Sequence, residues 1–313
     1  METITLKGTQ RPVSRLCMGG CPAGEYGWGN VSRAEVERAM LLALERGVNF
    51  FDTADTYGLG RSEETLGETL HAHRASLCLA TKFGVRVENG KTFFDNSPAY
   101  IATALSASLK RLKTDYIDLY QVHYLDEHTP VAQMMEALIA HKAKGDIAAI
   151  GLSNIHPEHI PAFAPYRDHI ATFQNHFSLA HRADEAAMAQ IATELQLVPL
   201  TWGSLGQGIL TGKYDASVHF DASDRRSRTI YDNFYGERLL RNLRIVEVMR
   251  PIARAHGVPV ASVAVRWILE KLQPSVVITG VKTPEQADAN AQALQFSLTP
   301  AQREALDAVS AEP

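Results

Sequence analysis

Short apolar runs of strand length, rich in β-branched and aromatic residues, recur along the whole chain and alternate with segments of helical periodicity. Runs that are apolar throughout are typical of parallel strands, which are buried on both faces. A count of eight favours a parallel sheet that closes into a barrel. The runs lie at 48–54, 77–82, 116–122, 147–153, 170–175, 197–202, 275–280 and, more weakly, 294–298.

The segments between these runs carry helix start signals. Ser32 precedes an apolar periodic stretch and has Glu35 three residues further on, the spacing of a capping box. Pro98 and Pro130, each after a serine or threonine, begin two further helical patterns. Strands therefore alternate with crossover helices, as the (β/α)8 barrel requires.

An open, doubly wound sheet is the competing fold. Its glycine fingerprint G-x-G-x-x-G is missing, because Glu63 stands where a third glycine would follow Gly58 and Gly60. Since no Pro/Gly/Ser-rich linker divides the chain, we expect one α/β barrel domain spanning residues 1–313. Residues 1–30 then precede the first barrel strand, and residues 206–236 form a loop long enough to have a function.

Composition narrows the choice of partners. The formal net charge is −4, from 31 basic and 35 acidic residues without a long run of either sign, which argues against nucleic acid or a membrane as the main partner. The three cysteines have no metal-type spacing. The chain has no signal-peptide pattern and no 18-residue apolar run, so we expect a cytoplasmic protein that acts on a small molecule.

Ionisable side chains stand at the ends of three consecutive predicted strands. Asp52 ends one run, Lys82 the next and His123 the third, and Tyr57 follows Asp52 by five residues. In α/β barrels the loops after the strands converge on one pocket, so strand-end residues are candidates for catalysis. A single buried Asp or His is more often structural. Four such groups at neighbouring strand ends predict an active site.

Several ordered motifs make the chain, from about residue 16 to residue 306, resemble the aldo-keto reductases. The resemblance implies a barrel that uses NADPH to reduce an aldehyde or ketone. The segments that carry it are FFDTADTYGLGRSEETLG at 50–67, ATKFG at 80–84, DYIDLYQVH at 115–123, GLSN at 151–154, FQNHFSL at 173–179 and TWGSLGQGILTGK at 201–213.

Carbonyl reduction needs a hydride at carbon and a proton at oxygen. A phenol is a weak acid near neutrality, with a reference pKa of about 10, and a nearby cation favours the phenolate. We therefore expect Tyr57 to donate the proton, with Lys82 as the cation and Asp52 holding it. His123 is expected to orient the carbonyl oxygen. A buried lysine at a strand end is also compatible with Schiff-base chemistry, as in aldolases, which leaves a Lys82-dependent lyase as an alternative.

The resemblance also implies how NADPH or NADP⁺ binds in the barrel mouth. Ser153, Asn154 and Gln174 would hold the nicotinamide carboxamide, and Trp202 would stack on its ring. Trp202 stands where tyrosine is commonest, and Ser204 where proline is usual. Small residues after the sixth strand would offer backbone amides to the pyrophosphate. These are Leu205, Gly206, Gln207 and Gly208.

The segment GVKTPEQADAN at 280–290 resembles the family's adenosine phosphate site and begins a helix. Lys282, Thr283 and Gln286 would face the 2′-phosphate, and Asn290 the adenine. Further expected cofactor contacts are Gly20, Cys21, Asp52, Gly203, Ser204 and Gly280.

Trp28 and Phe83 are expected to line the substrate pocket. His71 and His73 have the H-x-H spacing of barrel hydrolases, but they follow a helix rather than a strand, so we expect no metal. A cofactor-binding regulatory subunit, related to the reductases, is the non-enzymatic alternative.

Overall fold

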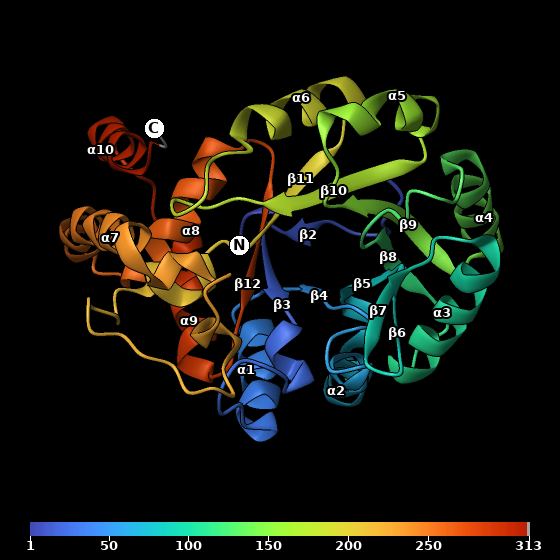
Figure 1. Cartoon of the computed structure of the whole chain (residues 1–313), viewed down its shortest axis with the longest axis horizontal. Coiled ribbons are helices and arrows are strands. Elements are labelled where there is room, and N and C mark those ends of the chain that lie inside the picture. The colour runs from blue at the N-terminus through green and yellow to red at the C-terminus, as the bar shows by residue number, and fades with distance from the viewer. Residues whose placement is uncertain (312–313) are drawn as a thin grey trace.

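The computed structural model describes residues 1–311 and contains a closed barrel of eight parallel strands, surrounded by helices (Figure 1). Around the barrel the strands follow the order β10-β11-β12-β3-β4-β5-β8-β9. The barrel strands are β3 (Leu16–Gly19), β4 (Phe50–Asp52), β5 (Cys78–Phe83), β8 (Ile117–Val122), β9 (Ile147–Ser153), β10 (Ile170–His176), β11 (Val198–Trp202) and β12 (Val276–Gly280).

The first barrel strand along the chain, β3, differs from the prediction. β3, only four residues long, lies between β12 and β4, so the expectation that residues 1–30 precede the first barrel strand is wrong. The predicted strand at 294–298 is also wrong. Leu294 ends a short 3-10 helix, and the amide of Leu298 donates to Oε1 of Glu270 at 3.0 Å. The apolar residues of 294–298 pack against a helix, which explains why they imitate a strand pattern.

Ten α-helices cover the barrel and its ends in the described part of the chain. Ser32 accepts a hydrogen bond from the amide of Glu35, and Ser97 from that of Tyr100, so two of the predicted helix starts are confirmed. The helices are α1 (Arg33–Glu45), α2 (Arg61–Leu70), α3 (Pro98–Arg111), α4 (Val131–Lys144), α5 (Ile160–Phe163), α6 (Glu185–Leu195), α7 (Gly236–His256), α8 (Val260–Lys271), α9 (Pro284–Ala291) and α10 (Pro300–Ser310).

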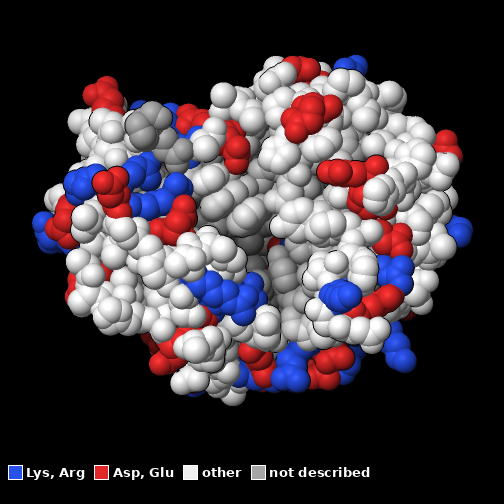
Figure 2. All heavy atoms as spheres, in the orientation of Figure 1, with Lys and Arg blue, Asp and Glu red and all other residues white. Residues whose placement is uncertain are grey.

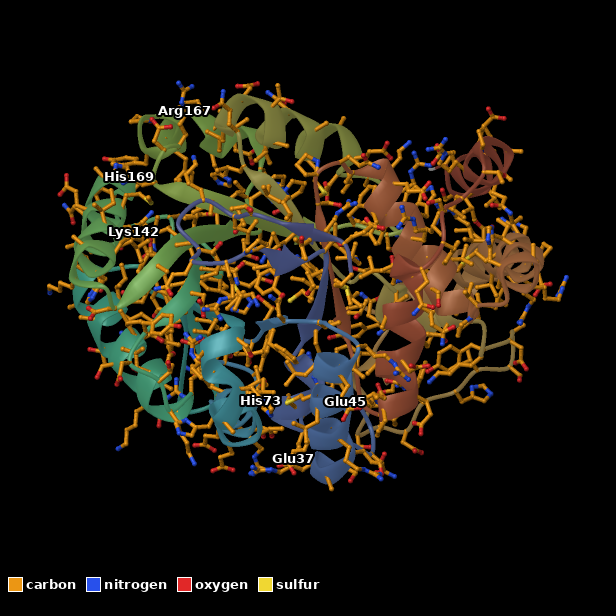
Figure 3. All side chains as sticks on the ribbon, turned by 180° about the vertical axis from the view of Figure 1, so that it is seen from behind. Glu37, Glu45, His73, Lys142, Arg167 and His169 are labelled. Carbon is orange, nitrogen blue, oxygen red and sulfur yellow. The ribbon has the colours of Figure 1, made fainter. Side chains whose placement is uncertain are left out.

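Side chains of the barrel strands alternate between the barrel interior and the helix layer. Phe50, Cys78 and Leu119 form an inner cluster, to which Leu6 and Val13 add apolar side chains. Leu6 lies between β1 (Thr3–Ile4) and β2 (Val13–Ser14), an antiparallel hairpin. Figure 3 shows this hairpin across the rear of the barrel. The N-terminal end of the barrel is therefore closed, and the carboxyl ends of the strands form the open face.

Long connections lie on the open face. Residues 83–97 contain an antiparallel hairpin, β6 (Val85–Glu88) with β7 (Lys91–Phe94). The predicted loop at 206–236 contains three 3-10 segments, η5 (Gly206–Thr211), η6 (Arg225–Ser227) and η7 (Asp232–Phe234). Figure 2 shows this face hollowed at its centre, with Lys and Arg side chains along one edge. Among residues 1–311, no helix is long and apolar enough to cross a membrane.

Candidate active site

Three neighbouring strands bring the predicted tetrad together. Asp52 is the last residue of β4, Lys82 lies one residue before the end of β5, and His123 directly follows β8. Residues an even number of positions apart on a strand point to the same side of the sheet. Asp52, Lys82 and His123 each stand two or four positions after a residue of the inner cluster, so all three side chains point to the barrel axis. Those inner residues are Phe50, Cys78 and Leu119. Tyr57 reaches them from the loop between β4 and α2. Asp52 is 2% exposed, Lys82 1% and His123 8%.

The Lys82 ammonium group has three oxygen neighbours. Its Nζ donates to Oδ2 of Asp52 at 2.6 Å, to the carbonyl oxygen of Thr53 at 2.8 Å and to the Tyr57 hydroxyl at 3.5 Å. A buried ammonium is costly unless it is paired and hydrogen-bonded, and here both conditions hold. The Asp52 carboxylate thus fixes the position of the cation beside the phenol.

The Tyr57 hydroxyl keeps its proton at neutral pH. Burial raises the pKa of Tyr57 well above its usual value, and the nearby Cys21 and Asp52 groups raise it further. Burial therefore outweighs the effect of the neighbouring Lys82 cation, and the phenol keeps the proton that it is expected to donate.

His123 is a neutral imidazole. Burial, and then the Lys82 charge, lower its pKa well below the usual value. Its ring meets that of Tyr57 edge-on with centroids 5.9 Å apart. Among residues 1–311, its Nδ1 has no hydrogen-bond partner. A neutral imidazole carries one N–H donor, which can be offered to a carbonyl oxygen placed beside Tyr57.

Gln121 is a site residue that sequence reasoning missed. Its Nε2 donates to Oδ1 of Asp52 at 2.8 Å, and Nε2 of Gln174 donates to the same oxygen at 3.0 Å. Gln174 also donates to Oε1 of Gln121 at 3.0 Å. Both carboxylate oxygens of Asp52 are therefore bound. The alternation along β8 could have revealed Gln121, because it shares the inward parity of Leu119 and His123.

The residues expected at the nicotinamide end form a connected group. Ser153 Oγ donates to the backbone oxygen of Gln174 at 3.0 Å, which links β9 to β10. Asn154 donates from Nδ2 to the backbone oxygen of His123 at 3.0 Å, and its Oδ1 accepts from Nε1 of Trp202 at 3.1 Å. The structure therefore joins Trp202, through Asn154, to the strand end that carries His123.

The loop after β11 differs from expectation in its backbone amides. The amide of Gly206 donates to the carbonyl of Gly203 at 2.8 Å, and that of Gly208 to the carbonyl of Leu205 at 2.9 Å. The expectation that these two amides are free for a pyrophosphate is therefore wrong for this conformation. Ser204 Oγ donates to the carbonyl of Thr201 at 3.0 Å, a bond that proline could not make.

Lys282 lies in a cationic environment before α9. Burial lowers the pKa of Lys282 to about 8, and the charges of Arg226 and Lys213 contribute in the same direction. Its Nζ donates to the backbone oxygen of Trp28, and its amide donates to Oε1 of Gln286 at 2.9 Å. Thr283 is the N-cap residue of α9. A cation whose charge is disfavoured by its surroundings is suited to an anionic ligand.

The segment 224–226 is a second feature that the sequence did not indicate. Arg226 donates two hydrogen bonds to the Asp224 carboxylate, from Nε to Oδ1 at 2.9 Å and from Nη2 to Oδ2 at 2.6 Å. The same segment reaches the N-terminal side of the mouth, because Asp224 pairs with Trp28 and the amide of Arg225 donates to the carbonyl of Gly27 at 3.0 Å. The long loop thus crosses towards residues 27–28.

The remaining predicted contacts lie around the tetrad. The amide of Gly20 donates to the carbonyl of Asp52 at 2.7 Å, and Sγ of Cys21 accepts from Nε1 of Trp28 at 3.2 Å. Gly280 ends β12 and is exposed. Nδ2 of Asn290 is buried and has no partner among residues 1–311.

The two predicted pocket residues have different places. Trp28 is half-buried beside Cys21 at the mouth. Phe83 is fully buried in the outer core, where its ring stacks on Tyr120 at 4.9 Å. The expectation that Phe83 lines the pocket is wrong, because its position next to the inward-pointing Lys82 turns its side chain towards the helices.

The His71–His73 pair lies away from the open face. Both residues belong to η2 (His71–Ser76), which precedes β5 and so stands at the opposite end of the barrel. Figure 3 shows His73 in the view from behind. Within residues 1–311, no group of three or more His, Cys, Asp or Glu side chains is arranged to hold a metal ion.

Comparisons with known proteins agree with this geometry. The sequence model of the Aldo/keto reductase family matches residues 15–311. Aldo-keto reductase YhdN of Bacillus subtilis is 31% identical over 301 residues, which cover 95% of this chain and 90% of that protein. The NADH-specific methylglyoxal reductase of Escherichia coli is 28% identical over 320 residues, covering 96% of each. A solved glycerol dehydrogenase from Gluconobacter oxydans has a TM-score of 0.88 and 32% identity, covering 98% of this chain and 94% of that one.

A closed (β/α)8 barrel with tyrosine, lysine, aspartate and histidine gathered at its carboxyl end defines a class of barrel enzymes. The match to the family model identifies the family within this class. The chain belongs to the aldo-keto reductase family and is an oxidoreductase of that family.

Proposed function

We propose that the protein reduces an aldehyde or ketone to the alcohol with NADPH, and that Tyr57 supplies the proton. The single observation that carries the proposal is the position of the Lys82 ammonium, 2.6 Å from Asp52 and 3.5 Å from the Tyr57 hydroxyl. Such a pair prepares the site for negative charge on the phenol oxygen. The neutral His123 beside it adds a donor for the substrate oxygen.

The proton movement follows from these residues. A bound nicotinamide cofactor supplies the hydride that reaches the carbonyl carbon. The O–H bond of Tyr57 breaks as its proton passes to the carbonyl oxygen, which His123 holds by a hydrogen bond. The phenolate formed is stabilised by Lys82, because a fixed cation in a buried site interacts strongly with developing charge. Asp52 keeps that cation from moving away.

The residues at the mouth fit a phosphorylated dinucleotide. Lys282, with Arg226 and Lys213 nearby, provides positive charge for the 2′-phosphate, and α9 begins next to it. The unpartnered Nδ2 of Asn290 is a donor suited to the adenine. Trp202 is only partly buried, which leaves ring surface for the nicotinamide. Lysine lacks the planar fork of arginine, so we expect preference for NADPH with some NADH activity left.

Two experiments separate this proposal from the two alternatives. NADPH oxidation, followed by its absorbance, is expected with purified protein and 4-nitrobenzaldehyde. Nucleotide binding without turnover across a panel of aldehydes, ketones and sugars would instead support a regulatory subunit. For the lyase, borohydride added with substrate and without nucleotide would trap an adduct on Lys82, detectable by mass spectrometry. We expect no such adduct, since the Lys82 Nζ is engaged by the Asp52 carboxylate and the Thr53 carbonyl oxygen and would have to leave both to attack a carbonyl carbon.

A further inference from the structure

Three aromatic rings stack at the end of β10 and β11. His176 ends β10 and is paired in register with Trp202, which ends β11. The imidazole of His176 lies parallel to the Trp202 ring, with centroids 4.3 Å apart and planes 8° apart. His181 stacks on His176 at 4.0 Å and 13°. His176 is therefore the middle ring of the stack.

The imidazole of His176 packs directly against the backbone of Gly203. Gly203 has a φ of +67°, and a Cβ built there would lie 2.5 Å from Cδ2 and Nε2 of His176. No residue with a side chain could occupy position 203 without displacing the imidazole. His181 is held in turn, because its Nε2 lies 3.3 Å from Asp184 and its Nδ1 is 3.4 Å from Nη2 of Arg238.

His176 acts as an apolar ring rather than as a titrating group. Burial and, after it, the charges of His181 and Arg238 lower its pKa to about 3. Its Nε2 is buried without a partner within residues 1–311. A buried polar atom without a hydrogen bond is costly. The stacking contacts on its two faces, with Trp202 and His181, therefore hold the ring in place.

Trp202 is thus supported on its face by His176 and at its edge by Asn154, whose Oδ1 accepts from the indole at 3.1 Å. We propose that His176 is a positioning residue, which holds the indole of Trp202 in the plane against which the nicotinamide ring stacks. The inference rests on the proposed function, since it requires that a nicotinamide nucleotide binds here. It assigns a role to a side chain outside the catalytic tetrad.

The test compares two ligands and three variants. NADPH and 2′-phospho-ADP-ribose, which lacks the nicotinamide, are titrated by calorimetry into the wild-type protein, His176→Leu, His176→Phe and His169→Leu. His169 is the matched control, because it is exposed and precedes the same strand at the rear of the barrel (Figure 3). Thermal unfolding of each variant verifies that it is folded.

We expect His176→Leu to bind NADPH about threefold to tenfold more weakly, the range of one aromatic stack, and to bind 2′-phospho-ADP-ribose like the wild type. His176→Phe should restore NADPH binding, since it keeps a ring, and His169→Leu should change neither ligand. Equal loss for both ligands, an unchanged NADPH affinity in His176→Leu, or failure of phenylalanine to restore it would overturn the inference. Failure of the wild-type protein itself to bind NADPH would overturn the proposed function and the inference with it.

Discussion

The two halves of the barrel mouth differ in how their polar groups are held. On the side of β4, β5 and β8, Lys82 and Asp52 are almost completely buried and bind each other. On the side of β9 to β12, Ser153 and Gln174 are also buried on strands, but Lys282 lies in a connection, is half-buried, and binds Trp28 across the mouth. The charged groups of the first half are therefore on strands, and the charged group of the second half is on a connection.

The difference has a physical cause. A charge in the barrel interior must have its partner already in place, because an unpaired buried ion costs several kcal/mol. A loop charge near solvent can exchange one partner for another at little cost. We therefore expect substitutions in the tetrad half to change chemistry, and also stability where a buried charge loses its partner, and substitutions in the cofactor half to change nucleotide affinity. The four predictions below test that division.

The largest effect is expected for Lys82→Met. The substitution leaves Asp52 buried without its cation, so we expect a loss of about 3–5 kcal/mol in the free energy of unfolding. Turnover should fall by about 10²- to 10³-fold as the charge beside Tyr57 is lost. Urea unfolding and steady-state kinetics measure the two. The double substitution of Lys82→Met with Asp52→Leu should recover most of the stability and none of the activity. Recovery of activity would contradict the claim that the tetrad half determines the chemistry.

Tyr57→Phe comes next. Removing the hydroxyl should lower turnover by at least about 10²-fold, the usual contribution of a general acid, and leave nucleotide affinity unchanged. Stability should change little, because the contact of that hydroxyl with Lys82 is long, at 3.5 Å. Wild-type turnover in this variant would show that another group donates the proton.

In the cofactor half, Lys282→Ala should weaken NADPH binding by about 1–3 kcal/mol and barely affect NADH. The 2′-phosphate would lose a charged donor that NADH does not use. Titration of both nucleotides, followed by tryptophan fluorescence, measures the difference. Lys144→Ala, at an exposed position near the end of α4, is the control. Equal losses for NADPH and NADH would mean that Lys282 does not read the phosphate.

The smallest effect is expected for pH. The pKa of Lys282 is lowered to about 8, so the free protein loses this charge as the pH rises through 8, whereas the phosphate stays charged. NADPH affinity should therefore decline between pH 7 and pH 9, by less than the Lys282→Ala substitution causes. In Lys282→Ala the decline should be absent. A decline of the same size in that variant would assign it to another group.

Prediction from sequence succeeded where local signals and chemistry coincide. The gathering of Asp52, Lys82 and His123 at one end of the barrel is predictable, because an ionisable residue at the end of an apolar run is unusual and the barrel geometry brings such residues together. The helix starts at Ser32 and Ser97 follow from local capping. These features depend on a few neighbouring residues, which a sequence shows directly.

Features that depend on distant contacts were missed. β3 is four residues long, and only its place between β12 and β4 makes it a strand. The apolar residues of 294–298 resemble a strand, because burial against a helix requires the same residue types. Phe83 was placed in the pocket although its parity turns it to the outer core. The stack of His176 on Trp202 brings together residues 26 positions apart, and no local pattern indicates it.

The most direct test of the account follows the hydride itself. Wild-type protein is incubated with 4-nitrobenzaldehyde and NADPH that carries deuterium on the transferable position of the nicotinamide ring. We predict that mass spectrometry of the product finds 4-nitrobenzyl alcohol with one deuterium on the carbinol carbon, in an amount equal to the NADPH consumed. Alcohol without deuterium, or NADPH consumption without alcohol, would contradict carbonyl reduction by direct hydride transfer at this site.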